Sequence, residues 1–265
     1  MTAREIDDLV TQALSGDYED EAAWEAVRDL QLIGTREVFE IAAKWCQSTD
    51  ALTRTRGIDV LGQIGMVAGG SPNSFPEESY SVVAHLIQRE TEPQPLAAAL
   101  VALGHIGNPL AIPLVTKFAF HPDKKVRFDV AFALSSFPND PISISTLLQL
   151  MQDTDEDVRD WATFGLGVLG RTDSAEIRDA LAKRLADSNE NAREEAMVGL
   201  AKRKDQRVLP ALLLALEPSE RNSRVDEAAL LMLGMEDVPD GWTGPDYVAA
   251  LRKRFSLQLN YPAPD

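Results

Sequence analysis

The chain has 265 residues, of which 45% are apolar, 6% aromatic and 26% charged. This apolar content excludes a wholly disordered chain, and the scarcity of aromatic residues favours closely packed helices over sheets. The formal net charge of −16 repels phosphate backbones and anionic lipids, so neither nucleic acid nor a membrane is expected as a partner. Only one cysteine, Cys46, and no apolar run near the ~18 residues of a membrane span are present. A cytoplasmic protein is therefore expected.

One pattern recurs along most of the chain. Residues 1–18, with an amphipathic helix over 3–14, are expected to cap it. A Leu-Gly-like step then returns every 31 to 34 residues, except for one interval of 42, at Leu30, Leu61, Leu103, Leu134, Leu166, Leu200 and Leu233. The long interval contains a Gly/Pro/Ser/Asn-rich segment, 66–76, whose 11 residues account for the excess. Such a period predicts seven helix pairs over 19–234, with a loop insertion at 66–76.

Each repeat is expected to hold one longer and one shorter helix. In the fifth repeat, Asp153 or Asp155 is expected to cap a helix that runs from about Glu156 to Leu169. Gly170 should end that helix in the left-handed conformation, as Gly at the same place should do elsewhere. These other glycines are Gly34, Gly65 and Gly107. The shorter helices are predicted at 111–119, 143–151, 175–186 and 207–216.

The C-terminal part, 235–265, is expected to be a second cap. A helix is predicted over 244–257, with Pro245 in its first turn and basic residues in its last turn, where they complement the helix dipole. The tail 260–265 is expected to be frayed.

The repeated segments resemble a known family. The stretches Asp123-Lys-Lys-Val-Arg-Phe-Asp-Val-Ala-Phe-Ala-Leu and Asp155-Glu-Asp-Val-Arg-Asp-Trp-Ala-Thr-Phe-Gly-Leu-Gly resemble HEAT repeats, in particular the short units first associated with phycobilisome lyases. The resemblance implies an all-α fold over 1–265, a right-handed α-α superhelix of about seven helix pairs with terminal capping helices. It also implies that arginines at one repeat position pair with acidic residues between repeats. These are Arg54, Arg127, Arg159 and Arg193.

The resemblance does not select a function, because such arrays serve scaffolds, inhibitors, lyases and hydroxylases. HEAT-like deoxyhypusine hydroxylases bind iron through His-Glu motifs, and the sequence has no His-Glu dipeptide. HEAT-like DNA glycosylases use a basic cradle, which the net charge of −16 opposes. Phycobilin lyases remain an alternative on resemblance alone.

Two apparent motifs are better explained as parts of the repeat. The glycines of Gly165-Leu-Gly-Val-Leu-Gly170 match a dinucleotide fingerprint, but they close a predicted helix, whereas the fingerprint requires a strand before them and a helix after them. Asp153, Asp155 and Asp157 have the spacing that opens a calcium loop, but Val158 occupies the position that needs glycine. We therefore interpret the three acidic residues as a helix cap.

No catalytic, cofactor or metal site is predicted. His85, His105 and His121 do not form a metal-ligand motif, and Cys46 is expected to be a buried structural residue. The chain is therefore expected not to be an enzyme and to need no cofactor.

One helix face is predicted to bind a partner. The positions one and five residues after the repeat arginine point away from the core stripe, and in a HEAT-like array they would line the concave side. Ala97 and Val101 hold these positions in the third repeat. The proposed partner site comprises Phe128, Phe132, Trp161, Phe164, Asp160, Glu194, Val198, Glu227 and Leu231. Aromatic side chains rimmed by acidic ones suit a protein or peptide that carries basic residues.

The sequence therefore predicts a non-enzymatic scaffold or adaptor. Two alternatives remain open: a lyase- or chaperone-like protein that handles a tetrapyrrole or a modified protein, and self-association through the same patch.

Overall fold

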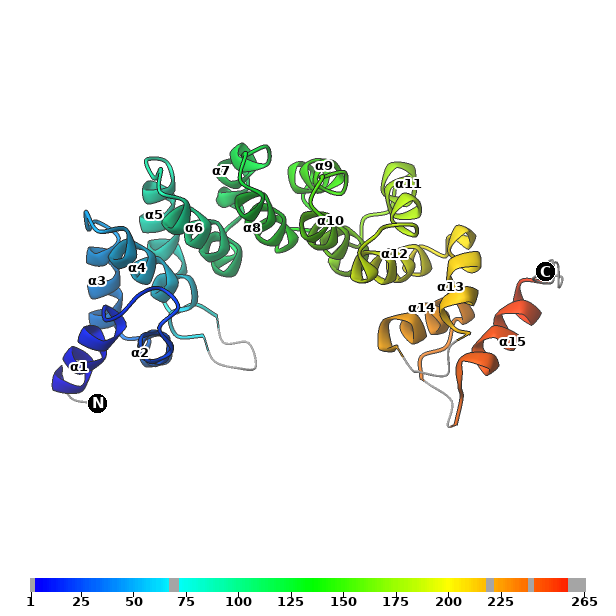
Figure 1. Cartoon of the computed structure of the whole chain (residues 1–265), viewed down its shortest axis with the longest axis horizontal. Coiled ribbons are helices and arrows are strands. Elements are labelled where there is room, and N and C mark those ends of the chain that lie inside the picture. Colours follow the sequence, from blue (N-terminus) through cyan, green and yellow to red (C-terminus); the bar gives the residue numbers. More distant parts are fainter. Residues whose placement is uncertain (1–2, 67–71, 218–221, 238–240, 257–265) are drawn as a thin grey trace. The chain divides into compact units, whose positions relative to one another are not determined.

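The computed structural model describes residues 3–66, 72–217, 222–237 and 241–256, and every regular element within them is helical (Figure 1). The predicted all-α helical-repeat fold is confirmed. Within the same residues, no helix is long and apolar enough to cross a membrane. The tail 260–265 and residues 67–71 of the predicted insertion lie outside the described residues.

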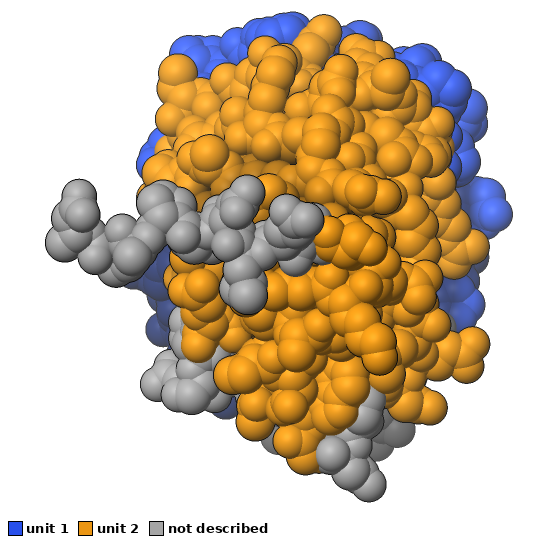
Figure 2. All heavy atoms as spheres, turned by 90° about the vertical axis from the view of Figure 1, so that its right-hand side faces the viewer, with its two compact units in different colours: residues 1–146 blue, residues 147–265 orange. Residues whose placement is uncertain are grey.

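The chain divides into two compact units, residues 1–146 and residues 147–265 (Figure 2). The boundary falls inside helix α9 (Pro141–Leu150). The description of 1–265 as a single repeat domain stays a prediction, and each unit is described by itself below.

Unit 1 is built from two layers of helices. In one layer each helix packs against the next; its members are α2 (Glu21–Ile33), α4 (Ala51–Gln63), α6 (Pro93–Ile106) and α8 (Lys124–Ser135). The other layer holds α3 (Arg36–Trp45), α5 (Pro76–Ile87) and the short α7 (Ile112–Val115). Helix α1 (Ala3–Ala13) packs on α2. The repeat leucines form the core, because Leu61, Leu103 and Leu134 are completely buried.

Unit 2 repeats this arrangement. Its first layer holds α10 (Glu156–Thr163), α12 (Glu190–Lys202) and α14 (Ser223–Leu233), and its second holds α11 (Ala175–Arg184) and α13 (Leu209–Ala215). Helix α15 (Gly244–Arg254) packs on α14. Its Pro245 and its basic last turn lie where the sequence placed them.

Acidic caps fix where the repeat helices begin. Asp20, Asp50 and Asp123 each accept a hydrogen bond from a backbone N–H of the first turn, at 2.7 to 2.8 Å. Asp155 caps α10 in the same way, as predicted. These bonds satisfy N–H groups that a helix leaves free at its start.

The helix ends confirm three of the four glycine predictions. Gly34, Gly65 and Gly107 have positive φ angles of 57°, 77° and 70°. Gly170 does not, since its φ of −69° and ψ of 140° are extended, and that prediction is wrong. The reason is that residues 164–169 form a wider π-helical turn, in which the N–H of Gly170 donates to the carbonyl of Gly165 at 2.8 Å. The chain then leaves the helix without a left-handed residue.

The repeat arginines connect neighbouring repeats. Arg54 bonds Glu90 at 2.7 Å and Arg159 bonds Asp187 at 2.8 Å, which confirms the implied pairing at these two positions. All four repeat arginines also donate to the carbonyls five and six residues earlier; for Arg127 these belong to Pro122 and His121. The arginine therefore fastens its helix to the turn before it.

Candidate functional site

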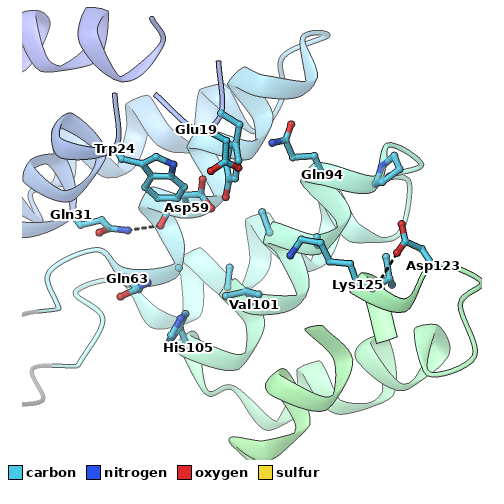
Figure 3. A pocket seen from close by; sticks show the side chains of 17 residues that line it. Glu19, Trp24, Gln31, Asp59, Gln63, Gln94, Val101, His105, Asp123 and Lys125 are labelled. Atoms are coloured by element: carbon cyan, nitrogen blue, oxygen red, sulfur yellow. Dashed lines mark hydrogen bonds between the residues drawn. The ribbon is translucent and has the colours of Figure 1, made fainter. Parts of the chain in front are cut away.

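A pocket of about 390 Å³ opens on the first helix layer of unit 1 (Figure 3). It is lined by the turn before α2 and by α2, α4, α6 and α8. Figure 3 shows Glu19, Trp24 and Asp59 on one side of it and Asp123 and Lys125 on the other.

Aromatic side chains form one wall of the pocket. The rings of Tyr18 and Trp24 meet edge to face, with 5.2 Å between their centroids. The buried guanidinium of Arg56 lies over both rings, 5.0 Å from the centroid of Tyr18 and 4.7 Å from that of Trp24. Arg56 also donates to the carbonyls of Asp17 and Tyr18 at 3.1 and 3.0 Å. This arginine therefore holds the wall against α4.

Asp59 places a carboxylate beside the aromatic wall. Its Oδ2 is shielded from solvent and has no hydrogen-bond partner. The amide of Gln31 donates at 2.8 Å to the backbone carbonyl of Asp59 and not to its carboxylate. Burial raises the pKa of Asp59 to about 7, although Arg56 and the Tyr18 hydroxyl act in the opposite direction. Near pH 7 this group is poised between its neutral and ionised forms.

Small side chains make the rest of the pocket apolar. Gly62, Ala97, Ala98 and Ala102 line it, and a Cβ added at Gly62 would lie 3.0 Å from that of Ala102. This spacing shows how closely α4 approaches α6. At the far end lies His105, whose pKa is lowered by burial. The imidazole is therefore mostly neutral at pH 7.

The rim carries most of the charge. Glu19 and Asp123 are exposed, and Lys125 is the only lysine or arginine among the described residues that line the pocket. The Lys125 side chain is 71% exposed, and its Nζ lies 3.6 Å from the carboxylate of Asp129.

In unit 1, the predicted partner face meets the pocket. Ala97 and Val101, which hold the two outward positions of the third repeat, both line it. On the next helix, Phe128 and Phe132 are partly exposed, and the ring of Phe132 lies 5.2 Å from that of His105. The aromatic pair of α8 therefore continues the surface that surrounds the pocket.

The remaining predicted site residues lie in unit 2. Trp161 and Phe164 are partly exposed and meet edge to face at 5.4 Å, and the guanidinium of Arg224 lies 5.8 Å from the Phe164 ring centroid. Asp160, Glu194 and Leu231 are partly exposed and Glu227 is exposed.

Val198 does not lie on this surface, since it is completely buried, and its prediction as a contact residue is wrong. The physical reason is that α12 packs against the 164–169 turn, α11 and α14, which together enclose every residue from 195 to 201.

A buried carboxyl group with an internal partner lies near the aromatic pair of unit 2. Glu195 accepts a hydrogen bond from Arg224. Burial and the nearby Asp160 raise the pKa of Glu195 to about 8, although Arg224 lowers it in part. Glu195 is therefore mostly protonated at pH 7, and the guanidinium of Arg224 lies beside it when it ionises.

The residues considered for chemistry have structural surroundings. Cys46 is buried, as predicted, and burial raises its pKa to about 12, so the thiol is not activated. Across the described part of the chain, no three His, Cys, Asp or Glu side chains are grouped as a metal site would require.

Trp24 and Asp59 of the pocket were not predicted as site residues, although the outward repeat positions include both. Trp24 lies one residue after Ala23, which holds the repeat arginine position in the first repeat. Asp59 lies five residues after Arg54 in the second repeat. Both therefore occupy the outward positions of their repeats.

Comparisons with known proteins agree with the fold. A family model described as HEAT repeats matches residues 80–167. Protein YibA of Escherichia coli is 30% identical over 210 residues, which cover 77% of this chain and 72% of YibA. The crystal structure of YibA superposes with a TM-score of 0.70, at 25% identity, over 96% of this chain and 93% of YibA. A phycocyanobilin lyase subunit alpha of Nostoc is 34% identical over 97 residues, or 36% of this chain and 35% of the subunit.

Proposed function

The chain belongs to the family of the helical-repeat protein YibA, and within that family we propose that it is a non-enzymatic module that binds a protein or peptide. The observation that carries the proposal is the unit 1 pocket, which joins an aromatic wall, an apolar floor and a carboxylate. Binding sites commonly combine an apolar cavity with a few polar groups that orient the ligand.

The surface around the pocket supports a partner larger than a small molecule. Phe128 and Phe132 extend it along α8. Partly exposed aromatic side chains are common at the centres of protein interfaces, because they bury a large area at little cost in conformational entropy.

Unit 2 offers a second contact surface in this proposal. It comprises Trp161 and Phe164 with the polar and apolar residues beside them, Asp160, Glu194, Glu227 and Leu231. The acidic residues suit a partner that carries basic groups. The cytoplasm, in which an unmodified thiol such as Cys46 persists, is the proposed compartment.

The histidine of the pocket and the cysteine of the chain support binding over catalysis. His105 packs its ring against Phe132, and the buried Cys46 thiol has a raised pKa. A nucleophile would need a lowered pKa or an adjacent base.

A peptide display selection against the full chain tests the proposal. We expect enrichment of peptides whose affinity falls at least about tenfold in the double variant Phe128→Ser/Phe132→Ser or in Trp161→Ser/Phe164→Ser. Phe120→Ser is the matched control, because Phe120 is 78% exposed and lies outside both surfaces. Absence of any enriched peptide, or equal binding by folded forms of both double variants, would contradict the proposal.

A second candidate function is a lyase- or chaperone-like role with a tetrapyrrole or a modified protein. It is favoured by the likeness to the phycocyanobilin lyase subunit, which covers about a third of each chain. Titration with phycocyanobilin tests it, since binding would shift the bilin absorbance and saturate at one equivalent. A flat titration would dismiss it. Self-association, the third candidate, would appear as a dimer when the protein is sized in solution.

A further inference from the structure

We infer that the unit 1 pocket is a subsite for one cationic side chain, that of lysine or arginine, in the bound partner. The inference rests on the proposed function and deepens it. The aliphatic stem would lie on the alanine floor formed by Ala97, Ala98 and Ala102, and the charged end would meet the carboxylate of Asp59.

The first observation is that one oxygen of the Asp59 carboxylate is left without a hydrogen bond, although Tyr18 and Arg56 both interact with this group. Its Oδ2 lacks any hydrogen-bond partner, and the guanidinium of Arg56 donates to backbone carbonyls instead. A buried carboxylate without a partner disfavours folding. Later repeats carry apolar residues at the same position, namely Val101, Phe132, Phe164, Val198 and Leu231. The acid is therefore an addition to the repeat, and a ligand would explain it.

The second observation is the charge of the surroundings. Two further carboxylates, Glu19 and Asp123, stand at the rim of the pocket. An anionic group would be repelled by all three, and a neutral apolar group would leave Asp59 buried and unpaired. An ammonium or guanidinium group would pair with it and would also be attracted by the ring of Trp24.

The third observation is the size and shape of the cavity. A volume of about 390 Å³ accommodates one long side chain with some water and is too small for a folded element. Lysine and arginine combine an apolar stem with a charged end, as the pocket combines an apolar floor with Asp59. A bare metal ion would gain nothing from that floor.

Lys125 does not fill this role from within the chain. Its side chain is 71% exposed at the rim and lies 3.6 Å from Asp129. It opposes the approach of a second cation, so Lys125→Gln is expected to strengthen binding by about twofold.

The experiment uses the full chain and three matched pentapeptides, acetyl-Ala-Ala-X-Ala-Ala-amide with X as lysine, arginine or norleucine. Binding is followed through the indole N–H signal of Trp24, which Trp24→Phe assigns. We expect the lysine or arginine peptide to shift this signal saturably and to bind at least about tenfold tighter than the norleucine peptide, which has the apolar stem without the charge.

Two variants test where the charged end and the aliphatic stem of the ligand bind. Asp59→Asn should weaken binding of the cationic peptide at least about fivefold, and Ala98→Leu, which fills the pocket without altering Asp59, should abolish it. Glu40→Gln, which removes an exposed carboxylate from α3, is the matched control and should bind like the parent. Thermal unfolding confirms that each variant is folded.

The outcomes separate the inference from the proposed function. Equal binding of lysine and norleucine peptides, or unchanged binding in both folded pocket variants, would overturn the inference. Peptides that shift the Trp161 signal and leave Trp24 unmoved would also overturn it, while supporting the proposed function through unit 2.

Discussion

Asp59 of unit 1 and Asp187 of unit 2 are buried carboxylates with different surroundings. In unit 2, both oxygens of Asp187 accept hydrogen bonds, from Arg159 and from Arg184. Glu195 accepts one from Arg224 at one oxygen, while its other oxygen has no partner. In unit 1, by contrast, Asp59 lies near a buried arginine whose hydrogen bonds go to backbone carbonyls, and one of its oxygens has no partner.

This difference supports the proposed subsite in unit 1. An internally paired carboxylate contributes to stability and offers little to a ligand. An unpaired one in a pocket carries a free-energy cost that a ligand can relieve, and such groups concentrate at functional sites. Asp187 in unit 2 and Glu90 in unit 1 are therefore structural links between repeats, whereas Asp59 is the proposed recognition group.

The largest effect is expected from Asp187→Ala in unit 2. The Asp187 side chain is 1% exposed, and its removal leaves Arg159 and Arg184 without their shared partner. We expect a loss of about 3 kcal/mol in the free energy of unfolding, measured by urea denaturation, with faster hydrogen exchange in unit 2. Asp173→Ala, which removes an exposed ion pair to Arg178, is the control and should have no measurable effect. Equal effects of the two substitutions would contradict the comparison.

The stabilisation by Asp187 is expected to depend on pH in the acid range. Burial alone would raise the pKa of Asp187, but the bonds from Arg159 and from the N–H of Asn189 hold it at about 2. Because this folded-state pKa lies below the unfolded value of about 3.9, the stabilisation is complete above pH 4 and is lost as the pH falls towards 2. The difference between the parent and Asp187→Ala should shrink over that window.

An effect of opposite sign is expected from Asp59→Asn in unit 1. The folded-state pKa of about 7 lies above the unfolded value of about 3.9. Ionised Asp59 therefore destabilises the protein increasingly from pH 4 to pH 7, and fully above pH 7. At pH 8 the variant should be more stable by about 2 kcal/mol, and below pH 4 the two proteins should be equal. A variant less stable than the parent at pH 8 would show that Asp59 serves the fold.

Neighbouring groups do not obscure this measurement. Tyr18 and Cys46 both have raised pKa values and stay neutral through the range. His105 can titrate within the range, but it does so in parent and variant alike. The comparison of the two proteins therefore isolates Asp59.

The smallest effect concerns a buried polar side chain that secures an irregular connection in unit 1. Asn73 donates to the carbonyl of Leu61 at 2.8 Å and accepts from the N–H of Phe75 at 2.9 Å. In unit 2, Arg203 has a similar role, because it donates to the carbonyls of Leu166 and Thr172. Asn73→Ala should cost about 1 kcal/mol in urea unfolding and speed hydrogen exchange in unit 1 only. Faster exchange in unit 2 would show that the units do not open independently.

Much of the fold followed from local chemistry. The period of about 32 residues, the aspartate caps and the glycines after the helices act over a few residues, so Asp155, Gly34 and Gly107 could be assigned without tertiary information. The exception was Gly170, because the wide turn before it depends on packing: a Cβ on Gly167 would lie 2.8 Å from the carbonyl oxygen of Glu195.

The candidate site depended far more on tertiary structure. The repeat position identified an outward face and therefore Ala97 and Val101, but periodicity does not tell how deeply neighbouring helices enclose a side chain. Packing on three sides buries Val198, whereas the small residues between α4 and α6 leave a cavity beside Asp59. The sequence by itself determined the repeats and the helix layers, because these are set by contacts within one repeat or with the next, and the family resemblance implied the links made by Arg54 and Arg159. Only the tertiary structure decided where the layer opens and which carboxylate lacks a partner, because burial and pairing depend on several helices at once.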